Sequence, residues 1–71
     1  MVSTITGKYY DEGKAVPFSN VKQAYAYMKH GVVPIDVFAG NDKAGNDRII
    51  FVFSREDHDE WKYKWRKLLE S

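Results

Sequence analysis

The stretch IDVFAGNDKAGNDRIIFVF, residues 35–53, decides the fold because it places two strand-like segments around a polar loop. The first segment lies within Val32–Ala39, and Pro34 cannot donate a ladder hydrogen bond, so we expect the regular strand to begin at Ile35. The second segment, Arg48–Phe53, holds five apolar residues in a row, which is typical of a covered or central strand. We predict that the two strands pair as an antiparallel hairpin.

Alternation of side chains gives the first of these strands two faces. Ile35, Val37 and Ala39 are expected on one face, with Asp36 and Phe38 on the other. Since a slip of one residue would turn Ile35 and Val37 to the wrong face, the pairing of the strands must keep its register.

The loop between the strands raises the question of whether it holds a ligand or only turns the chain. Gly40–Asn46 spells G-x-x-x-x-G, but Asn-Asp and a strand follow, whereas a phosphate-binding loop needs a following helix. A calcium loop fails because Lys43 and Gly45 occupy positions that need oxygen ligands. We interpret the segment as an exposed hairpin loop. It is longer than the roughly two to five residues usual in hairpins, so residues 40–47, with Lys43 and Arg48, remain a candidate contact surface.

A first helix is predicted to follow Ser19-Asn20 and to end before Gly31. Asn20 suits the N-cap position, and Gln23 three residues later completes a loose capping box. Gly31 suits the left-handed position after a helix. Four apolar residues share the spacing of one helix face, and we expect that face to pack on the sheet: Val21, Ala24, Tyr25 and Met28.

A second helix is predicted over residues 55–70, where Ser54 and Asp57 form a near capping box. Its first turns are acidic and its second half is basic, an order that suits the helix dipole. We expect Trp65 to be buried against the sheet, because it lies at the centre of an apolar stripe: Trp61, Trp65, Leu68 and Leu69.

The N-terminal part holds one strand candidate and one short extended piece. Residues 2–10 are rich in types that favour strands, interrupted by Gly7. Ala15–Phe18 follows a turn, and Pro17 keeps this piece away from the centre of a sheet. We therefore predict one α+β domain over residues 1–71, a small antiparallel sheet with two helices packed on it, in the order β-(β)-α-β-β-α.

Composition narrows the classes of function. The 71 residues contain no Cys, which excludes disulfides and Cys-based zinc sites, and aromatic residues make up 15% of the chain. A net charge of +1 creates no whole-molecule field for polyanions. The start lacks the pattern of a signal peptide, and no apolar run approaches the roughly 20 residues that span a bilayer. We expect a cytoplasmic protein that does not contact a membrane.

Catalytic and metal sites are not indicated. His58 stands among acidic residues, but neighbours along a helix point in different directions, and a helical metal pair needs i,i+3 or i,i+4 spacing. No Ser-His-Asp or paired-carboxylate pattern can be picked out. We expect a protein that is not an enzyme and needs no cofactor or metal.

Residues 61–67, WKYKWRK, interleave basic and aromatic side chains. One interpretation is an amphipathic helix with a solvated basic side. The other is a cationic rim around an aromatic patch, with Lys62, Tyr63 and Arg66 binding nucleic acid or an acidic protein. The acidic first half of the same helix would repel a long phosphate backbone.

The pieces AYAYMKHG, PIDVFAGNDKAGND and RIIFVFSREDHDEW follow one another between residues 24 and 61. In this layout, from Phe18 onward, the chain resembles a family of very small proteins encoded by phages and mobile elements of Gram-positive bacteria. That family has no assigned activity that can be transferred to individual residues of this chain. The resemblance implies that this chain is an accessory protein encoded by a phage or a mobile element. Such proteins often inhibit or adapt host machinery.

The sequence therefore supports two hypotheses of function. The first is a non-enzymatic protein-interaction module, in its specific form an inhibitor or adaptor of a host protein. The alternative is a small nucleic-acid-binding accessory protein that uses the basic and aromatic C-terminal helix. A homodimer is compatible with either hypothesis, and the candidate contacts are Lys43, Arg48, Lys62, Tyr63 and Arg66.

Overall fold

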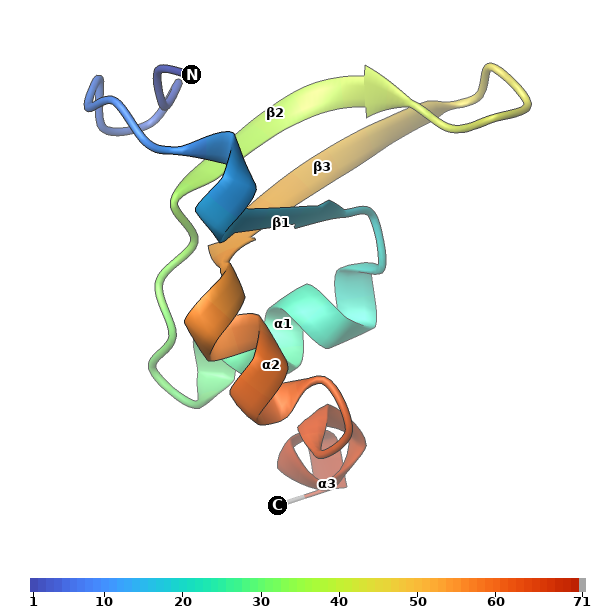
Figure 1. Ribbon diagram of the computed structural model, residues 1–71. Helices are drawn as coiled ribbons and strands as arrows, with labels where there is room; N and C mark the ends of the chain where they lie inside the picture. Colours follow the sequence, from blue (N-terminus) through green and yellow to red (C-terminus); the bar gives the residue numbers. More distant parts are fainter. Residues whose placement is uncertain (71) are drawn as a thin grey trace.

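A three-stranded antiparallel sheet in the order β1-β3-β2 organises the computed structural model, which describes residues 1–70 (Figure 1). This confirms the predicted α+β class and the antiparallel hairpin. The strands are β1 (Ala15–Phe18), β2 (Asp36–Asn41) and β3 (Asp47–Ser54). A short 3-10 helix, η1 (Glu12–Lys14), precedes β1. The described residues also form three α-helices: α1 (Val21–Lys29), α2 (Arg55–Trp61) and α3 (Trp65–Glu70).

The apolar strand β3 lies in the centre of the sheet, as its unbroken run of apolar residues predicted. Pro17 lies opposite Val52 on the edge strand β1, where a missing N–H group costs no ladder bond. On the other side, Asp36 of β2 also lies opposite Val52, and Val37 lies opposite Phe51. Directly opposed residues share a face, so the register fixes which side chains meet the helices.

Helix α1 begins and ends where its capping residues predict. The Asn20 side chain accepts a hydrogen bond from the Gln23 N–H at 3.2 Å, and Gly31 has a φ of +97°, a conformation that glycine adopts without strain. The predicted buried face of α1 is wrong, however. The buried residues are Ala24, Ala26 and Tyr27, whereas three of the four residues expected inside are exposed: Val21, Tyr25 and Met28.

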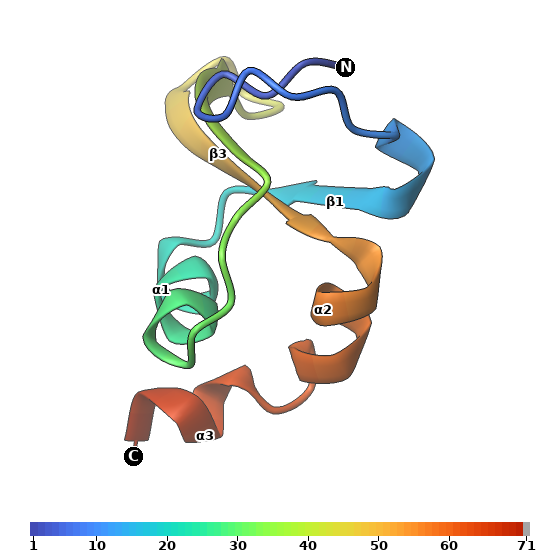
Figure 2. The same cartoon turned by 90° about the vertical axis from the view of Figure 1, so that its left-hand side faces the viewer.

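The predicted second helix, residues 55–70, is broken into α2 and α3 by a turn at residues 62–64. Its start is as predicted, because the Ser54 hydroxyl accepts a hydrogen bond from the Asp57 N–H at 3.2 Å. The break redirects the chain so that α3 packs mainly on α1 (Figure 2). In one straight helix, the Trp61 and Trp65 side chains would lie one turn apart on the same face. The turn lets both indoles contact the same core cluster.

The core lies between α1 and the helix-facing side of the sheet and is largely aromatic. Ala24, Tyr27 and Phe53 form its fully buried centre, and Tyr27 meets Phe53 edge-on at 5.0 Å between ring centroids. Phe18 stacks on Phe53 at 5.6 Å. Trp65 packs against this cluster but is only half-buried, and it reaches the cluster from α3 beside α1, which corrects the expectation that it would be buried against the sheet.

The strand expected within residues 2–10 does not form. One isolated bridge, between Val2 and Tyr9, is the only strand-like pairing in this segment. The segment instead lies on the side of the sheet away from the helices, as both ribbon views show (Figures 1 and 2). Polar side chains hold it there, and Asp36 is at their centre.

Candidate functional site

The five candidate contact residues fall into two groups at opposite ends of the molecule. Lys43 and Arg48 belong to the hairpin of β2 and β3, which projects past the helices, whereas Lys62, Tyr63 and Arg66 lie at and after the turn between α2 and α3 (Figures 1 and 2). The structure therefore does not bring these residues together into one surface.

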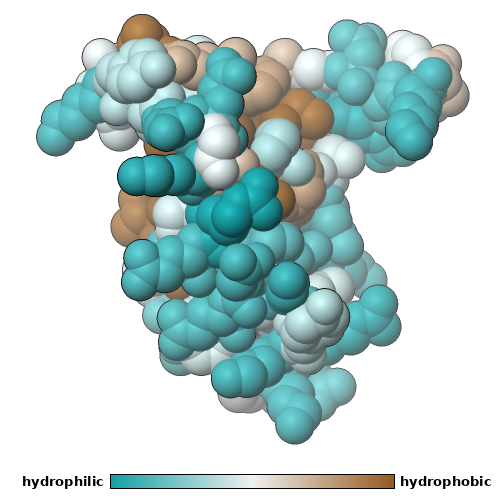
Figure 3. Space-filling model, in the orientation of Figure 1, coloured by the Kyte–Doolittle hydropathy of each residue, from teal (hydrophilic) through white to brown (hydrophobic). Residues whose placement is uncertain are grey.

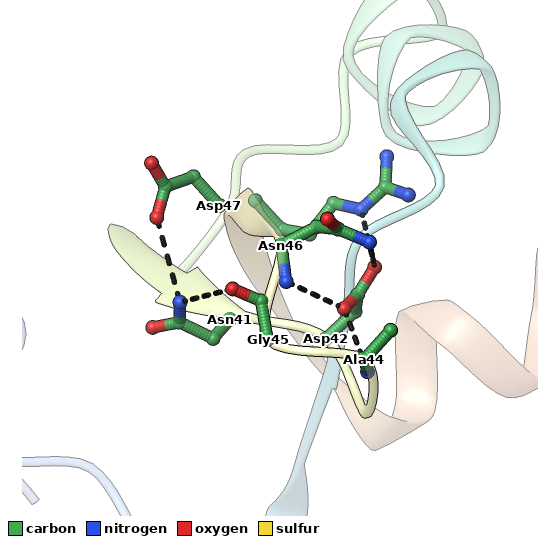
Figure 4. A network of polar contacts seen from close by, with 7 residues as sticks. Asn41, Asp42, Ala44, Gly45, Asn46 and Asp47 are labelled. Carbon is green, nitrogen blue, oxygen red and sulfur yellow. Dashed lines mark hydrogen bonds and ion pairs between the residues drawn. The ribbon is translucent and has the colours of Figure 1, made fainter.

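The hairpin loop is organised around the Asp42 carboxylate (Figure 4). Asp42 accepts hydrogen bonds from the backbone N–H groups of Ala44 and Asn46, both at 2.9 Å, and from Arg48 Nε at 3.1 Å. These bonds, with the Asn46 N–H making the largest contribution, hold the pKa of Asp42 below its usual value. Gly45 supplies the left-handed backbone of the turn, with a φ of +83°.

This geometry corrects the idea that the loop is unusually long. Because β2 extends to Asn41 and β3 begins at Asp47, only residues 42–46 remain between the strands. A loop of that size is ordinary for a hairpin. Arg48 is engaged in the ion pair with Asp42, and Lys43 is exposed at the tip. The hairpin end is a self-contained turn, and its length no longer points to binding.

The C-terminal group has cations laid over aromatic rings. Lys62 Nζ lies 3.3 Å from the Asp59 carboxylate and 5.2 Å from the centroid of the Tyr63 ring. The Arg66 guanidinium lies 5.1 Å from the centroid of the Trp65 ring. Such contacts contribute about 0.5–1 kcal/mol each at exposed sites. Tyr63 itself is 87% exposed, so this aromatic ring is available to a partner.

Helix α1 presents a surface that the sequence interpretation had assigned to the core. Val21, Tyr25 and Met28 are 61%, 56% and 39% exposed and recur at i, i+4 and i+7 along one side of the helix. Lys22 and Lys29 are exposed beside them. We call these five residues the outer face of α1. Sequence reasoning missed it because small Ala24 and Ala26 and the large Tyr27 fill the packed side instead.

A polar cluster on the far side of the sheet was also missed. The side chain of Asp36 is only 1% exposed and accepts hydrogen bonds from the N–H and hydroxyl of Thr4, at 2.8 and 2.6 Å, and from the Tyr10 hydroxyl at 3.2 Å. The Thr4 hydroxyl contributes most to holding the pKa of Asp36 low. Burial and then the bond to Asp36 raise the pKa of Tyr10. The available sequence signal for this cluster was a single acidic residue between two apolar strand residues, Ile35 and Val37, shortly after Pro34.

A cavity of about 200 Å³ lies beside this cluster, between the N-terminal segment and the sheet. It is mainly apolar, and its lining includes Tyr10, Pro17, Phe38 and Val52. The space-filling view shows hydrophobic surface gathered over this part of the molecule, whereas the surface over α2 and α3 is hydrophilic (Figure 3).

One further polar contact reaches the core. The Tyr27 hydroxyl lies 3.1 Å from His58 Nδ1 and accepts a hydrogen bond from Gln23 Nε2 at 2.8 Å, which leaves its own proton free to be donated to a neutral imidazole. Burial is the main cause that lowers the pKa of His58. The contact joins α1 to α2 across the aromatic core.

The side chains and helices of the described residues bear on two classes of site. Over residues 1–70, no three His, Asp or Glu side chains are grouped as ligands for a metal ion. Within the same range, the helices are too short or too polar to cross a membrane.

Comparison with known proteins adds no relative. The chain matches no family model, no curated protein and no solved structure. The resemblance to small phage-encoded proteins therefore stays a prediction, and the surfaces described above are the observations that bear on function.

Proposed function

We propose that this chain is a non-enzymatic protein-interaction module that binds a partner protein through the outer face of α1. The observation that carries the proposal is the exposure of Val21, Tyr25 and Met28 in one line along a helix. Scattered apolar side chains are normal on protein surfaces, but a contiguous patch is a mark of an interaction site.

The position of this patch strengthens the proposal. The outer face of α1 belongs to a helix whose opposite side is anchored in the core by Ala24 and Tyr27, so the exposed side is held on a rigid element. A rigid helix loses little conformational freedom when it binds. Tyr25 adds an aromatic ring with a polar tip, which is a residue type enriched at binding hot spots.

The specific form of the proposal is an inhibitor or adaptor of a host protein, and it rests on the resemblance to phage and mobile-element proteins. An affinity pull-down from a lysate of a Gram-positive bacterium, with and without nuclease, tests it. We expect at least one protein to be retained after nuclease treatment. The variant Tyr25→Gln/Met28→Gln should lose that protein, because Gln keeps helix propensity but removes the apolar contact.

The matched control is Val33→Gln, which alters an apolar residue that is 76% exposed but lies outside α1. This variant should retain the partner. Circular dichroism and thermal unfolding must show that all variants are folded. Retention of the same protein by Tyr25→Gln/Met28→Gln would contradict the assignment of the site, and loss of every partner after nuclease treatment would contradict protein binding itself.

A nucleic-acid-binding function is the second candidate, and one observation favours it. Tyr63 is 87% exposed in a turn that also holds Lys62 and Lys64, an arrangement on which a base could stack. Acidic residues of α2 directly precede this turn, and Lys62 is already paired with Asp59. If this candidate were correct, the affinity for single-stranded DNA or RNA would fall steeply with salt and would depend on Tyr63.

A further inference from the structure

The outer face of α1 has a definite pattern of charge as well as of apolar groups. At 3.6 residues per turn, Val21, Tyr25 and Met28 form one line, and Lys22 and Lys29 both lie to the same side of it. The helix contains no acidic residue. A partner that covers the apolar line therefore places its own flanking side chains next to two ammonium groups.

The rest of the molecule makes this side more basic than the net charge of +1 suggests. Helix α3, which packs on α1, carries Arg66 and Lys67 against one acid, Glu70. Helix α2 carries four acids against one Arg and lies on the other side of the helical layer (Figure 2). The charges are thus segregated, with the basic charges on the α1 and α3 side.

We propose, as a refinement that rests on the proposed function, that the outer face of α1 binds an acidic amphipathic helix of the partner protein. The apolar side of that helix covers Val21, Tyr25 and Met28, and its Asp or Glu residues lie toward Lys22 and Lys29. The apolar line extends over seven residue steps, about 10 Å, so two to three turns of a partner helix suffice. Met28 adds an adaptable contact, because Met side chains fit varied surfaces.

A helical partner fits this surface better than the other classes of occupant. A phosphate backbone would gain from the lysines but would leave the apolar line without a matching surface. An extended peptide needs an exposed sheet edge for its backbone hydrogen bonds, and α1 offers none. A helix satisfies its own backbone bonds and presents apolar and acidic side chains at the i, i+3 and i+4 spacing that α1 itself uses.

The test uses the full chain and two designed helical peptides of about 18 residues, with the same Leu face and with either Glu or Lys on the flanking positions. Fluorescence anisotropy measures their affinities at low and at high salt. We expect the Glu peptide to bind at least about tenfold more tightly than the Lys peptide, since attraction to two lysines is replaced by repulsion. The preference should shrink as salt screens the charges.

Two charge-reversed variants sharpen the measurement. Lys22→Glu/Lys29→Glu should reverse the preference between the peptides. The control Lys8→Glu/Lys43→Glu changes the net charge by the same amount at exposed sites in the N-terminal segment and the hairpin loop, so it should leave the preference for the Glu peptide in place. Reversal by both variants would show a whole-molecule charge effect and would overturn the proposal.

The remaining outcomes separate this inference from the function on which it rests. Equal binding of both peptides, or binding of neither while the pull-down retains a protein that depends on Tyr25, overturns the acidic helix and leaves the protein-interaction function standing. If neither peptide binds and the pull-down retains no protein, both fail. Sedimentation that shows a dimer, made monomeric by Tyr25→Gln/Met28→Gln, assigns the face to a second copy and also overturns the acidic partner helix.

Discussion

Asp36 is a carboxylate within a strand, and its surroundings explain how such a residue is tolerated there. Its oxygens accept bonds from Thr4, Tyr10 and the N–H of Val37, so its buried charge is well supplied with donors. The Thr4 hydroxyl also lies 2.8 Å from the carbonyl oxygen of Val37, so its single proton is shared between that carbonyl and the Asp36 carboxylate. Side chains from the N-terminal segment therefore occupy backbone groups at the start of the edge strand β2, which limits unwanted pairing there.

The first prediction is that Asp36→Asn loosens the N-terminal segment. The neutral amide oxygen of Asn is a weaker acceptor than the charged carboxylate for the bonds that the Thr4 N–H and hydroxyl donate to Oδ1, and the NH₂ group cannot accept the bond that the Tyr10 hydroxyl donates to Oδ2. We expect a lower melting temperature and faster hydrogen exchange at the N–H of Thr4. The control Glu60→Gln changes an exposed acid of α2 and should alter neither quantity. Unchanged exchange at Thr4 in Asp36→Asn would contradict the role assigned to the carboxylate.

The second prediction concerns the pH dependence of stability through His58. Because the pKa of His58 is lower in the folded protein than its usual value of 6.5, folding favours the neutral imidazole. The stabilisation is complete above about pH 6.5 and decreases as the pH falls below that value, since the unfolded chain then binds more protons. The lowered pKa values of Asp36 and Asp42 act in a separate window, below about pH 3.8, where their contributions are lost.

Urea unfolding at pH 7.5 and pH 5 measures this effect. We expect a lower free energy of unfolding at pH 5, and the variant His58→Asn should lose much of the difference, because an amide oxygen can replace Nδ1 as an acceptor but does not titrate. His30→Asn is the control, and it should keep the difference. Equal pH dependence in His58→Asn and the wild type would show that the contact with Tyr27 does not govern the titration.

At the scale of elements, residue types predicted where the helices and strands begin and end. Tertiary packing determines which face of each helix is buried, and the sequence did not predict that. The caps at Asn20 and Ser54, the central position of β3 and the edge position of Pro17 all follow from residue type, and the sequence predicted them. The break at residues 62–64 carries neither Gly nor Pro, so no local signal announced it. It depends on how α3 meets α1, which is information that periodicity does not contain.

The third prediction is that the hairpin tolerates a shorter loop. Asn41 and Asp47 are the last paired residues, so replacing residues 42–46 with Asn-Gly keeps the register and supplies a turn that suits twisted strands. The bonds made by Asp42 stay within the loop and its flank and do not reach the core. We expect the melting temperature to change by less than about 8 °C. An unfolded product would show that the turn around Asp42 is needed for strand pairing.

The whole molecule has a small aromatic core and three candidate contact surfaces, of which two were identified from the sequence. Tyr27, Phe53 and Asp36 are the largest fully buried side chains, so few large apolar groups are hidden, and several remain outside. The candidate contacts at the hairpin were identified from the length of the loop and its basic residues, and those at the C-terminal turn from interleaved basic and aromatic residues. The outer face of α1 could not be identified in this way, because its spacing is equally typical of a helix packed in a core.

The measurement that tests the central claim most directly is site-specific photo-crosslinking. A benzophenone side chain is placed in turn at Tyr25 on α1, Lys43 in the hairpin loop, Tyr63 in the C-terminal turn and Val33 as an exposed apolar control. The folded variants are irradiated in nuclease-treated lysate of a Gram-positive bacterium. We predict a discrete protein adduct from position 25 and none from positions 33 and 43. Adducts from position 43 or 63 without any from position 25 would contradict the claim that the outer face of α1 binds the partner.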